Sequence, residues 1–297
     1  MKFNINNQQY DTSQKPVIMG ILNLSVDSPV SSSISSVDKA VQRAHKLIED
    51  GATIIDIGGD STSSLANDIS LEKELVLIKK VVSQLHDANI ITSIDTWKHQ
   101  VAEVAVNAGA SIVNDVTGFR DPKMVQVVKE NSAIALVMHM RGVPKKHYEV
   151  DQNYQSIQEE VFDYLNQQFK MLNEQGISDI WIDPGFGFGK SVSDNVSLFN
   201  SIKHYKQLNL PIVISASRKG FLAEIIGMGN TQKGDELLEA TMLFNVLSYL
   251  LGADILRVHD VKNMHSSIET LWGLVHFSNG TNESSDYYSK FKNLFNV

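Results

Sequence analysis

The feature that most constrains the fold is a regular alternation of short apolar runs with longer amphipathic stretches. Several of the short runs are continuously apolar, as expected for strands that are buried on both faces. The strands predicted in this way are Val17–Leu22, Thr53–Ile57, Ile90–Ile94, Ser111–Val113, Ile134–Met138, Ile180–Ile182, Pro211–Ser215 and Asp254–Val258. Apolar residues at three- and four-residue spacing predict helices at Val37–Asp50, Leu71–His86, His99–Ala108, Gln155–Gln175 and Leu237–Leu251.

A glycine closes several of these helical stretches just before the next strand. Gly51, Gly109, Gly176 and Gly252 hold this position, where a left-handed residue typically ends a helix. Eight strands that each precede a helix indicate an α/β fold, a single (β/α)8 TIM barrel, and 297 residues is a normal length for one. A doubly wound sheet is less favoured, because no Gly-rich dinucleotide turn follows the first strand.

One domain is therefore expected, at residues 16–277. Residues 1–15 form an N-terminal extension and residues 278–297 a polar C-terminal tail.

Composition narrows the classes of partner. Lys and Arg number 26 against 34 Asp and Glu, a formal charge of −8, which argues against nucleic acid. The absence of cysteine excludes disulfides, thiolate catalysis and Cys-bound zinc. The polar start lacks a secretory signal, and no apolar run approaches the ~20 residues of a membrane span. We expect a cytoplasmic protein with no membrane partner.

Polar residues stand where each predicted strand ends, and the active sites of such barrels lie at the carboxyl ends of the strands. Ser, Thr, Asp and Asn are also preferred helix caps, so any one of these residues has a structural explanation. Lys219, Arg257 and His259 do not share it. The full ring is Asn23, Asp56, Asp60, Thr62, Asp95, Asn114, Asp115, His139, Asp183, Ser217, Arg218, Lys219, Arg257, His259 and Asp260.

These residue types indicate a chemistry. The carboxylates Asp95 and Asp183, with the amide of Asn114, suit a flat heterocycle that has several N–H donors. Lys219, Arg257 and His259, with Asn23, suit a phosphate or a pyrophosphate. The combination suggests transfer of a heterocyclic alkyl group with pyrophosphate as the leaving group.

The run Asp183–Lys190 resembles the end of a phosphate-binding loop, but that motif requires glycine where Pro184 stands. Its glycines allow close backbone approach, and Phe186 and Phe188 are suited to line an aromatic substrate. A metal site at His139 and His147 is the weaker interpretation, because no i, i+4 pair lies on a helix.

Taken together, the motifs resemble those of the dihydropteroate synthase family over about residues 16–277. The matching phrases are Met19–Asn23, Ile55–Gly59 with Ser61 and Thr62, Ser93–Thr96, Asn114-Asp115, Met138–Met140, Asp183–Lys190, Ser217–Lys219 and Arg257–Asp260. The resemblance implies condensation of 6-hydroxymethyl-7,8-dihydropterin pyrophosphate with para-aminobenzoate to give 7,8-dihydropteroate and pyrophosphate. It also implies Mg²⁺ and a homodimer.

The resemblance assigns roles by position. The implied pterin ligands are Asp95, Asn114, Met138, Asp183 and Lys219. The implied pyrophosphate ligands are Asn23, Thr62, Arg257 and His259, with Asn23 also at the metal. Thr62, Phe188, Lys219 and Gly220 would border para-aminobenzoate. Lys219, Asp95, Arg257 and His259 are the implied catalytic residues, and Lys190 receives no role.

Departures from the family pattern fall in loops near the second substrate. The first loop has Pro29 and Ser31 in place of phenylalanine and aspartate, and Ser63 stands where an arginine is usual. Gly220 replaces a frequent serine. Two alternatives therefore remain beside a working synthase: a pterin-binding paralogue with weak, absent or redirected activity, and a methyltransferase-type barrel that binds a methylated folate.

Overall fold

Eight parallel strands form the barrel in a computed structural model that describes residues 1–24, 37–60, 69–229 and 234–276. Their order is β8-β7-β6-β5-β4-β3-β10-β9, and a bridge between Ile182 and Ile212 joins the two ends. The strands are β3 (Val17–Asn23), β4 (Ile54–Gly58), β5 (Ile91–Asp95), β6 (Ile112–Asp115), β7 (Ile134–Met138), β8 (Ile180–Asp183), β9 (Val213–Ile214) and β10 (Ile255–Val258). The predicted (β/α)8 TIM barrel is confirmed.

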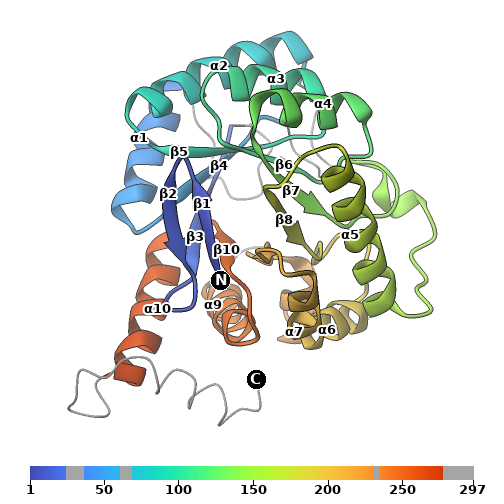
Figure 1. Ribbon diagram of the computed structural model, residues 1–297. Helices are drawn as coiled ribbons and strands as arrows, with labels where there is room; N and C mark the ends of the chain where they lie inside the picture. The colour runs from blue at the N-terminus through green and yellow to red at the C-terminus, as the bar shows by residue number, and fades with distance from the viewer. Residues whose placement is uncertain (25–36, 61–68, 230–233, 277–297) are drawn as a thin grey trace.

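Helices surround the strands (Figure 1). They are α1 (Val37–Glu49), α2 (Leu71–Asp87), α3 (His99–Asn107), α4 (Pro122–Asn131), α5 (Ile157–Glu174), α6 (Val192–Asn200), α7 (Ile202–Tyr205), α8 (Gly220–Ile225), α9 (Asp235–Leu250) and α10 (Val261–His276), with short 3₁₀ helices η2 (His147–Glu149) and η3 (Lys206–Leu208). All five predicted helices are present. The spacing of apolar residues predicts no range for α4, α6, α7, α8 or α10, of which α7 and α8 are too short to show a helical period.

The glycines that close the helices adopt the predicted left-handed conformation. Gly51 has φ of 109° and Gly252 has φ of 114°. At Gly51 a Cβ atom would lie 2.4 Å from the ring of His265, so a larger residue does not fit. The chain can therefore pass from helix to strand within four residues, from Glu49 to Ile54 and from Leu250 to Ile255.

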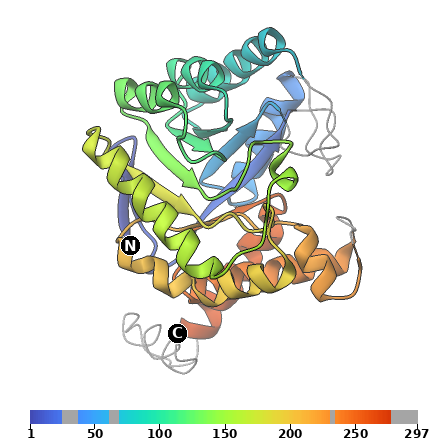
Figure 2. The ribbon, with the colours of Figure 1, turned by 90° about the vertical axis from the view of Figure 1, so that its right-hand side faces the viewer.

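A hairpin of β1 (Lys2–Ile5) and β2 (Gln8–Asp11) covers the amino-terminal end of the barrel. Asn6 and Asn7 form its turn with positive φ, which suits a tight hairpin. Ile5 is buried in the barrel interior, and the Phe3 ring packs edge-on against Trp181 at 5.1 Å between centroids. The hairpin and the loop that contains η2 lie at opposite ends of the barrel (Figure 2), so the carboxyl ends of the strands lie on the side of η2.

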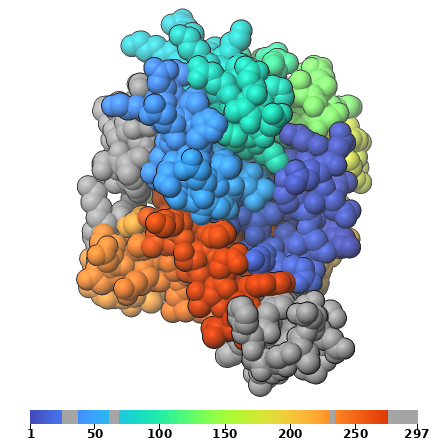
Figure 3. Space-filling view, turned by 90° about the vertical axis from the view of Figure 1, so that its left-hand side faces the viewer, coloured from blue at the N-terminus to red at the C-terminus, as the bar shows by residue number. Residues whose placement is uncertain are grey.

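Helices α9 and α10 lie side by side on the outside of the molecule (Figure 3). Leu243 and Leu247, one turn apart on α9, are exposed, whereas Thr241 and Asn245 are buried against the barrel. Exposed leucines of this size are unusual on the outward face of a helix that covers a barrel. Among the helices of the described ranges, none is both long enough and apolar enough to span a membrane.

Candidate active site

Arg257 lies at the centre of the polar groups at the carboxyl ends of the strands. Its Nε donates to Asp56 Oδ2 at 2.5 Å and its terminal nitrogen donates to Asp95 Oδ2 at 2.5 Å. Burial lowers the pKa of Arg257, but Asp56 and Asp95 more than offset this and raise the pKa above its ordinary value. The guanidinium is therefore a permanent cation that joins β10 to β4 and β5.

The register of neighbouring strands brings three of the expected ligands to one height. Asn23 pairs with Gly58, Gly58 pairs with Asp95, and Asp95 pairs with Asn114. The amide of Asn114 also donates to Asp56 Oδ2 at 3.2 Å. Burial raises the pKa of Asp95 to about 7, although the neighbouring Arg257 guanidinium acts to lower it, so this carboxyl lies between its charged and neutral forms near pH 7.

Asp56 belongs to the predicted ring of polar residues and is a further candidate ligand residue, for which the sequence indicates no role. It is fully buried, and its Oδ1 atom accepts no hydrogen bond from the described residues. A buried acceptor is costly to leave without a donor. Asp56 Oδ1 is thus suited to accept an N–H from a ligand.

Asp183 and Met138 form the opposite side of the site, because they pair across β8 and β7. Asp183 is buried and accepts the backbone N–H of Gly185 at 2.7 Å. Burial raises its pKa, while hydrogen bonds from Ser215 and Gly185 lower it. Met138 belongs to an apolar cluster that can pack against a ring, together with Val116, Met140, Phe188 and Trp97.

Lys219 and Phe188 form a cation–π pair, with Nζ 3.9 Å from the ring centroid. Burial lowers the pKa of Lys219 to about 8, and Arg257 adds to this. A Cβ atom on Gly187 would lie 3.0 Å from the Lys219 side chain, so this glycine lets the lysine pack along the loop. Gly220 follows Lys219 as the first residue of α8.

His259 is neutral at physiological pH. Burial, with Arg257 nearby, lowers its pKa to about 3. Its Nδ1 lies 2.9 Å from Ser217 Oγ, which already accepts the backbone N–H of His259. We therefore assign the Ser217 proton to this bond and a proton to Nε2, so that His259 offers a hydrogen-bond donor rather than a positive charge.

The structure thus gathers most of the expected residues at one end of the barrel. Thr62, Pro29, Ser31 and Ser63 lie outside the described residues. His139 is buried beside Tyr164, with ring centroids 5.1 Å apart, and its Nε2 lies 3.7 Å from Glu160 Oε1. Ser217 and Lys190 make contacts that sequence patterns do not predict, because the partners are distant in the sequence. Ser217 contacts His259, and Lys190 contacts His139.

The protein groups available for Mg²⁺ are few. Within the described ranges no three His, Asp or Glu side chains gather into a metal site. Mg²⁺ commonly takes one or two protein oxygens and completes its shell with phosphate oxygens and water. The half-buried Asn23 amide at the end of β3 fits that mode, in which the metal arrives with a diphosphate.

A chain with this barrel and this ring of acceptors and cations falls in the class of pterin-binding enzymes, and residues 19–259 match the model of that family. The dihydropteroate synthase of Bacillus subtilis is 35% identical over 256 residues, which cover 84% of this chain and 86% of the relative. The chain belongs to the dihydropteroate synthase family.

Solved structures of dihydropteroate synthases are similar to the fold of this chain. A Thermus thermophilus dihydropteroate synthase in complex with 4-aminobenzoate has a TM-score of 0.80 at 27% identity and covers 93% of this chain and 100% of that one. A Xanthomonas albilineans synthase in complex with 7,8-dihydropteroate has a TM-score of 0.77 at 27% identity, with coverage of 92% and 98%.

Replacing Arg257 tests its central position. Arg257→Met leaves Asp56 and Asp95 without their cation, which should lower the free energy of unfolding by about 3–5 kcal/mol at pH 7. Unpaired buried carboxylates bind protons more readily in the folded than in the unfolded state, so the loss should shrink by about pH 5. Urea unfolding at both pH values measures it. Lys15→Met, which removes the surface ion pair with Glu269, should cost under about 1 kcal/mol; equal losses would contradict the prediction.

Proposed function

We propose that this chain condenses 6-hydroxymethyl-7,8-dihydropterin pyrophosphate with para-aminobenzoate, giving 7,8-dihydropteroate and pyrophosphate. The observation that carries the proposal is the meeting of buried carboxylates, the Asn114 amide, Arg257 and the Lys219–Phe188 pair at one barrel end. The family of the chain supports it, as do relatives whose complexes contain 4-aminobenzoate and 7,8-dihydropteroate.

The pterin is bound by acceptors on strands and by an apolar face. Asp183 accepts two N–H groups from one edge of the ring system, and Asp56 Oδ1 with the Asn114 amide serves the opposite edge. Met138 packs against the ring face. Lys219 reaches the ring from the loop side, where its ammonium donates to a ring oxygen or nitrogen.

The reaction needs no protein nucleophile. The C–O bond to pyrophosphate breaks, the methylene carbon becomes electron-poor, and the amine nitrogen of para-aminobenzoate forms the new C–N bond and releases a proton. Asp95 offsets the positive charge that develops on the pterin. Arg257 orients Asp95, and Arg257 with the Nε2–H of neutral His259 faces the departing pyrophosphate.

Mg²⁺ bound with the pyrophosphate, and held at Asn23, supplies further charge neutralisation. The residues described here position the pterin and donate hydrogen bonds independently of that ion. We also propose for Thr62 the role expected from the sequence, as a pyrophosphate ligand that borders para-aminobenzoate.

The alternatives are less well supported. A pterin-binding paralogue without synthase activity is not favoured, since the chain matches curated synthases over most of its length. The same matches disfavour a methyltransferase-type barrel. The loop departures at Pro29, Ser31 and Ser63 leave the acceptors on the strands unchanged.

Turnover is the direct test. Purified protein with the pterin pyrophosphate, Mg²⁺ and para-aminobenzoate should form dihydropteroate, followed by chromatography together with pyrophosphate release. Lys219→Ala should lower kcat by about 100-fold or more, since it removes the buried cation next to both substrates. Lys206→Ala, at the far end of the barrel, is the control. Tight pterin binding without product would contradict the proposal.

The pH dependence should report Lys219. Its ammonium is present below its pKa of about 8 and is lost above it, so kcat/KM should fall at higher pH. Lys219→Arg keeps the charge and should move the alkaline limb above about pH 10. Initial rates from pH 6 to about 10.5 measure the limb, and Lys206→Arg should leave it in place. A wild-type profile that stays flat beyond about pH 9.5 would exclude this role.

We also propose a homodimer formed by the outer helices. Leu243 and Leu247 on α9, with Val196 on α6 and Ile225 on α8, are exposed on helices that pack against one another in sequence. Leu243→Glu with Leu247→Glu should convert the dimer to monomers in analytical ultracentrifugation. Leu274→Glu, at a leucine of α10 that is also exposed, should leave it intact; a monomeric wild type would refute the proposal.

A further inference from the structure

We infer that Lys190 is a positioning residue for the second-substrate side of the site: it ties the end of β7 to the β8 loop and so sets the Phe188 ring under Lys219. The inference rests on the proposed function, because it uses Phe188 and Lys219 as the border of para-aminobenzoate. Lys190 ends the run Asp183–Lys190 and takes no part in the mechanism described above.

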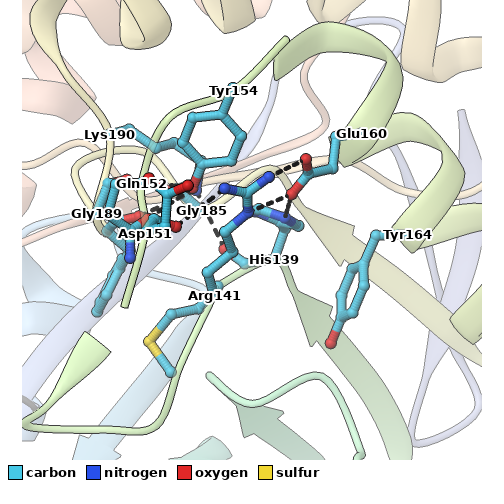
Figure 4. Close-up of polar contacts among 12 residues, drawn as sticks. His139, Arg141, Asp151, Gln152, Tyr154, Glu160, Tyr164, Gly185, Gly189 and Lys190 are labelled. Atoms are coloured by element: carbon cyan, nitrogen blue, oxygen red, sulfur yellow. Dashed lines mark hydrogen bonds and ion pairs between the residues drawn. The ribbon is translucent and has the colours of Figure 1, made fainter. Parts of the chain in front are cut away.

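The ammonium of Lys190 is surrounded by backbone carbonyls. Nζ donates to Gly185 O at 2.8 Å, to His139 O at 3.3 Å and to Phe188 O at 3.3 Å (Figure 4). Burial lowers the pKa of Lys190 to about 7, and in its ammonium form the three N–H bonds match these three acceptors. Within the described residues Lys190 makes no ion pair, and the hydrogen bonds of its Nζ atom all go to backbone carbonyls. No apolar side chain can replace them.

These carbonyls come from two segments that touch. A Cβ atom on Gly185 would lie 2.0 Å from His139 O, so only glycine lets the β8 loop approach the end of β7 so closely. Two carbonyl oxygens that face one gap repel each other unless a donor lies between them. Lys190 supplies that donor.

The loop is held on its other side by α6. Gly187 donates its backbone N–H to Asn195 Oδ1 at 2.8 Å, and the Asn195 amide donates to Lys190 O at 3.1 Å. The Phe188 N–H donates to Gly185 O at 3.3 Å and closes the turn. Lys190 fixes the inside of the turn and Asn195 its outside.

The turn controls where the Phe188 ring lies. That ring contacts Lys219 Nζ at 3.9 Å and the His147 ring at 5.6 Å between centroids. Asp183, by contrast, belongs to the β8 ladder and pairs with Met138. Loss of the Lys190 contacts should therefore shift the Phe188–Lys219 wall and leave the pterin acceptors on the strands in place.

Steady-state kinetics of Lys190→Met tests this separation. The KM for para-aminobenzoate should rise about 10-fold or more, since a displacement of about 1 Å at a substrate contact has effects of this size. Binding of the pterin pyrophosphate, measured by calorimetry, should stay within about 3-fold. Tyr154→Phe is the matched control, because it removes a hydrogen bond to Gly189 O of the same loop, at 3.1 Å, and leaves the three Lys190 contacts in place.

A double-mutant cycle tests whether Lys190 acts through Phe188. If it does, Phe188→Ala with Lys190→Met should raise the KM for para-aminobenzoate no further than Phe188→Ala alone. Additive effects would overturn the inference, as would an equal loss of pterin binding or a result like that of Tyr154→Phe. If Lys190→Met does not fold, the same measurements are made on Lys190→Gln, which keeps two N–H donors.

The outcomes also separate this inference from the proposed function. A wild type that forms no dihydropteroate would refute the proposed function alone. Calorimetric binding of para-aminobenzoate to protein saturated with pterin and diphosphate would then replace KM: weaker binding in Lys190→Met supports the inference, and unchanged binding overturns it.

Discussion

The site depends on one buried cation, the guanidinium of Arg257, held between the carboxylates of Asp56 and Asp95. Charges removed from water are stable in a protein only when they are paired and hydrogen-bonded. The strands involved are not neighbours, since β10 is separated from β4 by β3 and from β5 by two strands. The contact is possible because the sheet curves into a barrel and these side chains point toward its axis. Closure of the barrel and assembly of the site are one event.

The same balance of charges sets the state of the remaining groups. Arg257 and Lys219 face Asp56, Asp95 and Asp183, so the site contains compensating charges before any substrate arrives. Burial beside Arg257 keeps His259 neutral and brings the pKa of Lys219 down to about 8. A pyrophosphate that enters meets a permanent cation and oriented N–H donors rather than a cluster of unpaired cations. Such preorganised groups need little rearrangement as charge moves onto the leaving group.

The sequence predicted the features that depend on the local spacing of apolar residues and glycines. Continuous apolar runs such as Ile134–Met138 identified strands, and the glycine at residue 51 identified the end of a helix. The hairpin of β1 and β2 was not predicted, because each strand has four residues and a mostly polar exposed face. The hydrogen bonds from Arg257 to Asp56 and Asp95 were not predicted, because they join strands that are far apart in the sequence. The neutral state of His259 was not predicted, because burial lowers its pKa and no short motif encodes burial.

Strands and loops divide the work of the site. The acceptors proposed for pterin are fixed by ladder pairing, as Asp183 is with Met138 and Asn114 with Asp95. Substitution in a loop does not move them. The wall proposed for the second substrate is built on a turn, and a turn requires its own internal support, which Lys190 and Asn195 provide through backbone contacts. The run Asp183–Lys190 carries both Asp183 and the turn of Phe188, so the departures at Pro29, Ser31 and Ser63 leave the residues of the pterin acceptor and of the Phe188 wall unchanged.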